Sequence, residues 1–135
     1  MYLQNTCIGA SGSCTSVAWQ LTTGVTKANS SNRPRFSADG RFVAYVTFNA
    51  VISGQTLANP TVFLHDACTG APSGCAPQTI PACLASDGAI ADAACSLDGI
   101  SSDGKYILIS SPATNLSPLP GGVANPSYVV TNPLN

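Results

Sequence analysis

The stretch FSADGRFVAYVT, residues 36–47, decides the fold because a second copy of it, ISSDGKYILIS, follows at residues 100–110. MYLQNTCIGASGSC at residues 1–14 likewise returns as VFLHDACTGAPSGC at residues 62–75. The two offsets are 64 residues (100 − 36) and 61 residues (62 − 1). A period of this size, built from short β-type runs, indicates a repeat architecture in which each unit buries its faces against its neighbours.

The repeated stretches predict an all-β fold. In residues 41–48, Phe42, Ala44, Val46 and Phe48 share one face, whereas Val43 and Tyr45 share the other. Strands that are apolar on both faces belong inside a stack of sheets. The second copy has the same character, since Tyr106 and Leu108 oppose Ile107 and Ile109.

Turn residues divide one unit into a four-stranded antiparallel meander. Asp39-Gly40 and Asp103-Gly104 supply the short polar side chain and the conformational freedom that a tight turn needs. Residues 1–22 supply the third and fourth strands of one unit. Residues 100–131 supply the first two strands of another unit and the start of its third, where ANPSYVV is similar to ANPTVFL. The predicted strands of the complete unit are residues 34–37, 41–48, 61–67 and 77–84.

Composition excludes several classes of protein. Only 8% of the 135 residues are charged and the net charge is −1, so the clustered Lys and Arg of a nucleic-acid-binding protein are missing. No run approaches 18 apolar residues, so we expect no membrane-spanning helix. Residues 1–5 do not resemble a signal peptide.

Six cysteines point to an oxidising compartment. Because the first two pairs occupy the same frame of the repeat, local disulfides are the simplest interpretation. Zinc sites prefer closer spacings with histidine, and free buried thiols are the other alternative. An oxidised chain without an export signal leads us to expect a piece of a longer exported protein. The predicted pairs are Cys7–Cys14, Cys68–Cys75 and Cys83–Cys95.

RPRFSADGRFVAYVT, residues 33–47, resembles the repeat of TolB-like β-propellers, which are relatives of the Trp-Asp-repeat propellers. Residues 99–110 match less well, with Leu108 where Ala is usual. The run D-x-C-x-G-A-x-x-G-C at residues 66–75, with its counterpart at residues 5–14, resembles cysteine-bearing blades of exported bacterial proteins. The resemblance implies about two blades, divided as a partial blade at 1–32, a full blade at 33–86 and a partial blade at 99–135.

No catalytic residue, metal ligand or cofactor site is predicted. His65 corresponds to Gln4 and Thr131 in the other copies, so we expect it at a solvated or edge position. Asp39 and Asp103 have a complete explanation as turn residues. A calcium site is an alternative for the three aspartates of one connector, and Trp19 is expected to pack like Ile80, its equivalent. Those aspartates are Asp87, Asp92 and Asp98.

Binding is expected at one end of the strands. Successive turns of a meander alternate between its two ends, which gathers the long loops and the connectors at one of them. We call this the loop face: residues 23–33, 49–60, 86–99 and 111–126. Loops on a rigid scaffold commonly carry binding. The candidate binding residues are Asn49, Gln55, Asn59, Asn115 and Asn125.

Three functions remain open from the sequence. The first is a non-enzymatic, exported binding or scaffolding module that engages a protein or a glycan. The second is a structural subunit that associates with itself. The third is the non-catalytic propeller of an exported hydrolase, because folds of this kind serve many tasks.

Overall fold

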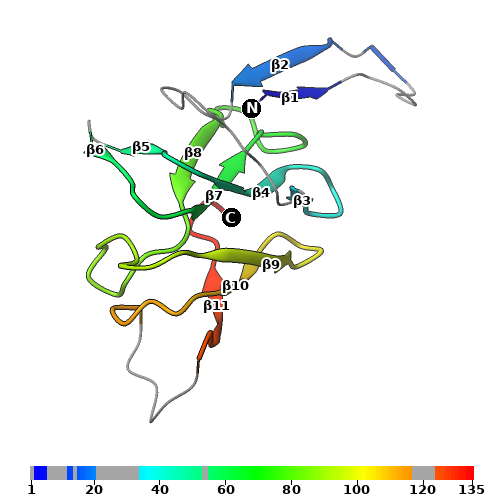
Figure 1. The fold of residues 1–135 in the computed structure, drawn as a ribbon. Coiled ribbons are helices and arrows are strands. Elements are labelled where there is room, and N and C mark those ends of the chain that lie inside the picture. Colours follow the sequence, from blue (N-terminus) through cyan, green and yellow to red (C-terminus); the bar gives the residue numbers. More distant parts are fainter. Residues whose placement is uncertain (1, 6–11, 14, 21–33, 53–54, 117–123) are drawn as a thin grey trace.

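A computed structural model describes residues 2–5, 12–13, 15–20, 34–52, 55–116 and 124–135. These residues form antiparallel strands and no helix, which confirms the all-β prediction (Figure 1). The strands are β1 (Tyr2–Asn5), β2 (Val17–Gln20), β3 (Arg35–Phe36), β4 (Phe42–Thr47), β5 (Val51–Ile52), β6 (Gln55–Thr56), β7 (Thr61–Asp66), β8 (Gln78–Pro81), β9 (Ser96–Ile100), β10 (Tyr106–Ser110) and β11 (Ser127–Thr131).

The complete unit forms the predicted four-stranded meander, in the order β3-β4-β7-β8. Within it, Leu64 of β7 pairs with Ile80 of β8. Leu3 of β1 pairs with Trp19 of β2 in the same way. Leu3 precedes Leu64, and Trp19 precedes Ile80, by the same offset of 61 residues. The backbone of the N-terminal sheet therefore repeats the register of β7 and β8, although the packing predicted for the Trp19 side chain lies outside the description.

The two copies of the tight turn have the same hydrogen bonds. The hydroxyl of Ser37 donates to the Asp39 carboxylate (2.5 Å), which also accepts from the Arg41 amide (3.0 Å). Ser101 donates to Asp103 in the second copy (2.6 Å), and that carboxylate accepts from the Lys105 amide. Both aspartates thus hold a turn closed, as the sequence predicts.

The core lies between the four-stranded sheet and the three-stranded sheet, whose order is β11-β10-β9. Alternate residues of β4 and β7 face the second sheet, because side chains of a strand alternate between its faces. Leu97, Ile107 and Ile109 meet them from β9 and β10. The buried residues of the first sheet in this cluster are Phe42, Ala44, Val46, Val62 and Leu64.

Four predictions about the strands are corrected. Strand β9 occupies the end of a stretch expected to be a connector, and the loop after β4 contains the short hairpin β5–β6. The second copy is not buried on both faces, because Tyr106 and Leu108 are exposed. Pairing of β10 with β11 is also one residue out of phase with the ANPSYVV alignment, so Val129 takes the position of Leu64.

Two predicted disulfides are present in the structure. Cys68–Cys75 closes the loop between β7 and β8. Cys83–Cys95 joins the segment after β8 to the start of β9 and lies in the core. Cys7 and Cys14 lie outside the described residues. The disulfides indicate an oxidising, extracytoplasmic location, and no helix in the described part of the chain is able to cross a membrane.

Replacing Gly104 by alanine should destabilise the protein far more than replacing Gly40. Both glycines have φ of +72°, which costs an alanine about 1–2 kcal/mol. A Cβ on Gly104 would also collide with the buried Phe42 ring, whereas one on Gly40 meets no atom within 4 Å. Overpacking of this kind adds about 1–3 kcal/mol. Urea unfolding of both variants checks this, and equal midpoints would contradict the packing.

Removing the core disulfide should cost more than removing the loop disulfide. The chain-entropy contribution is similar, about 2–3 kcal/mol for each short loop. Cys83→Ala with Cys95→Ala additionally leaves a space among buried side chains. Thermal unfolding of the two double variants compares them, with Cys68→Ala and Cys75→Ala as the control. A loss in the control as large as that in the core variant would contradict the packing contribution.

Candidate functional site

Asp92 joins the described parts of three segments of the loop face. The Asp92 carboxylate accepts hydrogen bonds from the amide (2.8 Å) and the hydroxyl (2.5 Å) of Thr114. Its backbone oxygen accepts from the side-chain amide of Asn59 (3.1 Å). The loop after β4, the connector and the loop after β10 are thereby held at the same end of the two sheets, opposite the tight turns (Figure 1).

Asn115 strengthens the same junction. Its side-chain oxygen accepts from the Asp92 amide (3.0 Å), and its side-chain amide donates to the Ile90 carbonyl (2.9 Å). The hydrogen bonds from Thr114 lower the pKa of Asp92, since they stabilise its charged form. Asp92 is therefore charged at neutral pH and positions the loops around it.

The five candidate binding residues divide into two groups. Asn59 and Asn115 bind the connector and have a structural role in the junction. Asn49, Gln55 and Asn125 are exposed on the loop face. Asn49 and Asn125 also have positive φ, 55° and 57°, a conformation that asparagine adopts more readily than most residues. These three side chains are exposed to solvent and remain candidates for binding.

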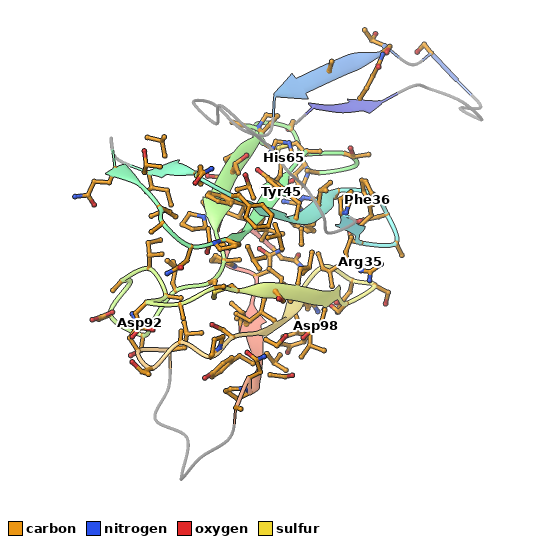
Figure 2. All side chains as sticks on the ribbon, in the orientation of Figure 1. Arg35, Phe36, Tyr45, His65, Asp92 and Asp98 are labelled. Carbon is orange, nitrogen blue, oxygen red and sulfur yellow. A yellow bond between two sulfur atoms is a disulfide. The ribbon has the colours of Figure 1, made fainter. Side chains whose placement is uncertain are left out.

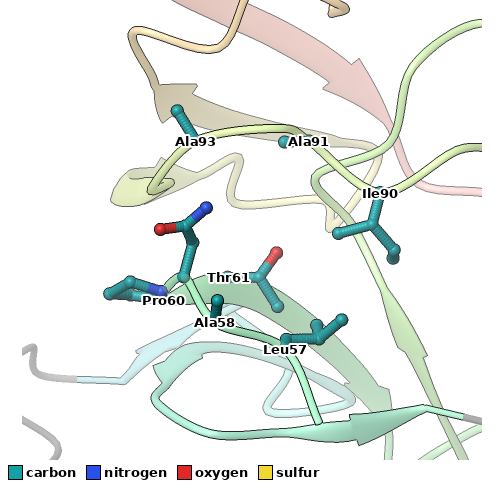
Figure 3. A pocket seen from close by; sticks show the side chains of 8 residues that line it. Leu57, Ala58, Pro60, Thr61, Ile90, Ala91 and Ala93 are labelled. Atoms are coloured by element: carbon teal, nitrogen blue, oxygen red, sulfur yellow. The ribbon is translucent and has the colours of Figure 1, made fainter. Parts of the chain in front are cut away.

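A small pocket lies in the loop face between the segment before β7 and the connector (Figure 3). Its volume is about 50 Å³, far below the roughly 300 Å³ of a typical small-molecule site. It therefore has no room for an organic substrate. The lining residues are Leu57, Ala58, Asn59, Pro60, Thr61, Ile90, Ala91 and Ala93.

A larger hollow of about 360 Å³ lies next to the loop after β10. None of the described residues that line it is charged, and the ring of Tyr128 is half-buried at its wall. A hollow with aliphatic walls and one aromatic ring suits a sugar face or an apolar side chain. Its lining residues are Leu84, Ser86, Ile109, Leu116, Tyr128, Val129 and Val130.

The structure corrects the prediction for His65, which is only 4% exposed on the interior strand β7. Its Nδ1 atom lies 2.9 Å from the Thr79 hydroxyl of the neighbouring strand. Burial lowers the pKa of His65, although the neighbouring Asp66 carboxylate opposes that shift. The residue of β11 that is equivalent to His65 is Val130 and not Thr131. His65 pairs with β4 and Val130 pairs with β10 at the same position of the repeat. His65 therefore lies in the buried interior of the fold and not at a solvated edge.

The three aspartates of the connector are not brought together. Asp87 accepts from the Ala89 amide in a local turn, and Asp92 and Asp98 lie at opposite ends of the connector and β9 (Figure 2). Among the described residues, the acidic and sulfur atoms that do cluster are those of Asp66, Cys68 and Cys75. Both cysteines are consumed by their disulfide.

Sequence reasoning missed two features of the loop face. Thr114 is 22 residues from Asp92, and no spacing rule relates them (114 − 92). The hollow is formed by residues from three separate segments, which only the packing of the sheets brings together. Comparisons with known protein families, with curated proteins and with solved structures find no match to this chain.

Stability should fall as the pH drops below about 4. Hydrogen bonds from Ser37 and Ser101 lower the pKa of Asp39 and Asp103, respectively, below the value in the unfolded chain. A carboxylate with a lowered pKa stabilises the fold above its unfolded pKa and loses this effect as it becomes protonated. Thermal unfolding between pH 7 and pH 2.5 measures the loss. Asp39→Asn should flatten the profile, and a flat profile for the unchanged protein would contradict the prediction.

Proposed function

We propose that the chain is a non-catalytic binding or scaffolding module of an exported protein, and that it engages a protein or glycan through the loop face. The observation that carries this is the junction around Asp92, which holds loops of two successive units in one rigid surface. A preformed surface loses little conformational entropy on binding. A ligand that contacts both units therefore finds its partners already in place.

The two hollows offer little to a charged small-molecule substrate. The pocket beside Asn59 is too small for one, and none of the described residues that line the hollow beside Leu116 is charged. The polar side chains around Asp92 are engaged in holding loops, which leaves aliphatic surface, the Tyr128 ring and exposed amide side chains to meet a ligand. Tyrosine and asparagine are common in surfaces that recognise macromolecules.

The proposal includes a fold assignment finer than all-β. The S-x-D-G turns, the four-stranded meander and the face-to-face packing of two units support blades of a TolB-like β-propeller. The disulfides support a secreted, periplasmic or cell-surface setting of the bacterial exported type.

Leu84→Lys should abolish ligand binding without unfolding the protein. Leu84 is partly exposed at the hollow, so a lysine there places a charge against any apolar group that enters it. A glycan array and an array of immobilised peptides serve as the probes, and far-UV circular dichroism checks the fold. We expect at least a tenfold loss of affinity, about 1.4 kcal/mol.

Ser73→Lys is the matched control, since Ser73 is exposed in the disulfide-closed loop at the other end of the strands. Binding that persists in Leu84→Lys but fails in Ser73→Lys would show that the binding site lies at the other end of the strands, where the tight turns are. Hydrolysis of any arrayed glycan or peptide by the purified chain would refute the non-catalytic assignment.

A further inference from the structure

The outer face of the three-stranded sheet exposes large apolar side chains. Tyr106 and Leu108 of β10 are 50% and 41% exposed, and Val129 of β11 is 69% exposed. Leu108 and Val129 pair directly across the two strands, so they form one patch. On the other side of Leu108, its partner in β9 is Gly99, which adds no side chain. The sheet thus presents an apolar surface to solvent.

The same face of the preceding unit is buried. Phe42, Ala44 and Leu64, which take the positions of Tyr106, Leu108 and Val129, are at most 1% exposed. They are covered by the next sheet of the same chain, β9 to β11. In the preceding unit, this face therefore packs against the face of another β-sheet of the repeat.

Strands β10 and β11 carry no protective charge on this face; the exposed charge of the sheet is Asp98, at the irregularity of the neighbouring strand β9. None of the described residues on this face of β10 and β11 is charged; besides the patch it carries Ser110, Ser127 and Thr131. Solvated sheets usually place lysine or another charge at such positions. Exposed apolar patches without charges commonly mark interaction surfaces.

We propose that this face packs against a second copy of the chain, with the β1–β2 sheet of that copy as the next layer. The sheets of one chain already follow one another in a single direction, from β1–β2 through the four-stranded sheet to β9–β11 (Figure 1). Because β1 and β2 repeat the register of β7 and β8, the contact adds a layer of the same type. The contact is head-to-tail, and it shares Val129 but not Leu108 with the lining of the hollow beside the loop face.

The test is the mass of the purified chain in solution, measured by light scattering and sedimentation from about 1 to 300 µM, a range that spans weak self-association. We expect a mass that rises with concentration. Val129→Lys and Leu108→Lys should each weaken association at least tenfold, because they place an ammonium group in the apolar contact. Val51→Lys is the control, since Val51 is also an exposed valine on a strand but lies in the hairpin β5–β6.

Each outcome decides the proposal. Association that is lost in the two patch variants and kept in the control supports it. A monomer over the whole range, association that survives both patch variants, or equal loss in Val51→Lys overturns it. Circular dichroism confirms that each variant is folded, and slower hydrogen exchange in β10 and β11 at high concentration gives an independent readout of the same contact. Because Val129 also lines the hollow of the proposed ligand site, Leu108→Lys, at a residue outside that lining, is the variant that separates the two proposals. Loss of association in Leu108→Lys with ligand binding kept supports the contact between copies alone.

Discussion

Strand β4 is buried along its whole length on both faces, and the arrangement of the described residues depends on this constraint. One face, with Phe42, Ala44 and Val46, requires a second sheet, which β9 to β11 provide. On the other face, the Tyr45 ring stacks on Phe63 at 5.9 Å between centroids, and its burial raises the pKa of the phenol. A strand that is buried on both faces needs a packed layer on each side, so β4 by itself requires a layered architecture.

Charged side chains among the described residues act mainly at the ends of strands. Arg41 forms a two-pronged ion pair with the buried Asp66 (2.8 and 3.0 Å) and also donates to the Leu134 carbonyl. The pair ties the end of β7 to the tight turn before β4 and to the C-terminal residues. Asp39, Asp87 and Asp103 likewise hold local turns by accepting hydrogen bonds from backbone amides.

The sequence was sufficient for local features. The meander, the Asp39 and Asp103 turns and the Cys68–Cys75 pair follow from local spacing, Cys83–Cys95 follows as the pair that remains, and each is present. It was insufficient where the outcome depends on contacts between units. His65 is polar and sits near a strand end, yet the layer around β7 buries it. The register of β11 slips by one residue because pairing with β10, and not similarity of letters, sets which face is buried.

Stacking and binding are physically linked in this architecture. Each added layer brings its long loops to the same end of the strands, as the junction of Asn59, Asp92 and Thr114 shows for two layers. In the proposed head-to-tail stack, every further copy would extend the loop face in the same direction. A ligand with repeated groups would then contact several equivalent surfaces at once, and its affinity would rise through effective concentration without any new type of contact. In this proposed arrangement, the outer face of β10 and β11 would set how many units are in line, and the loop face would set what each unit contributes to binding.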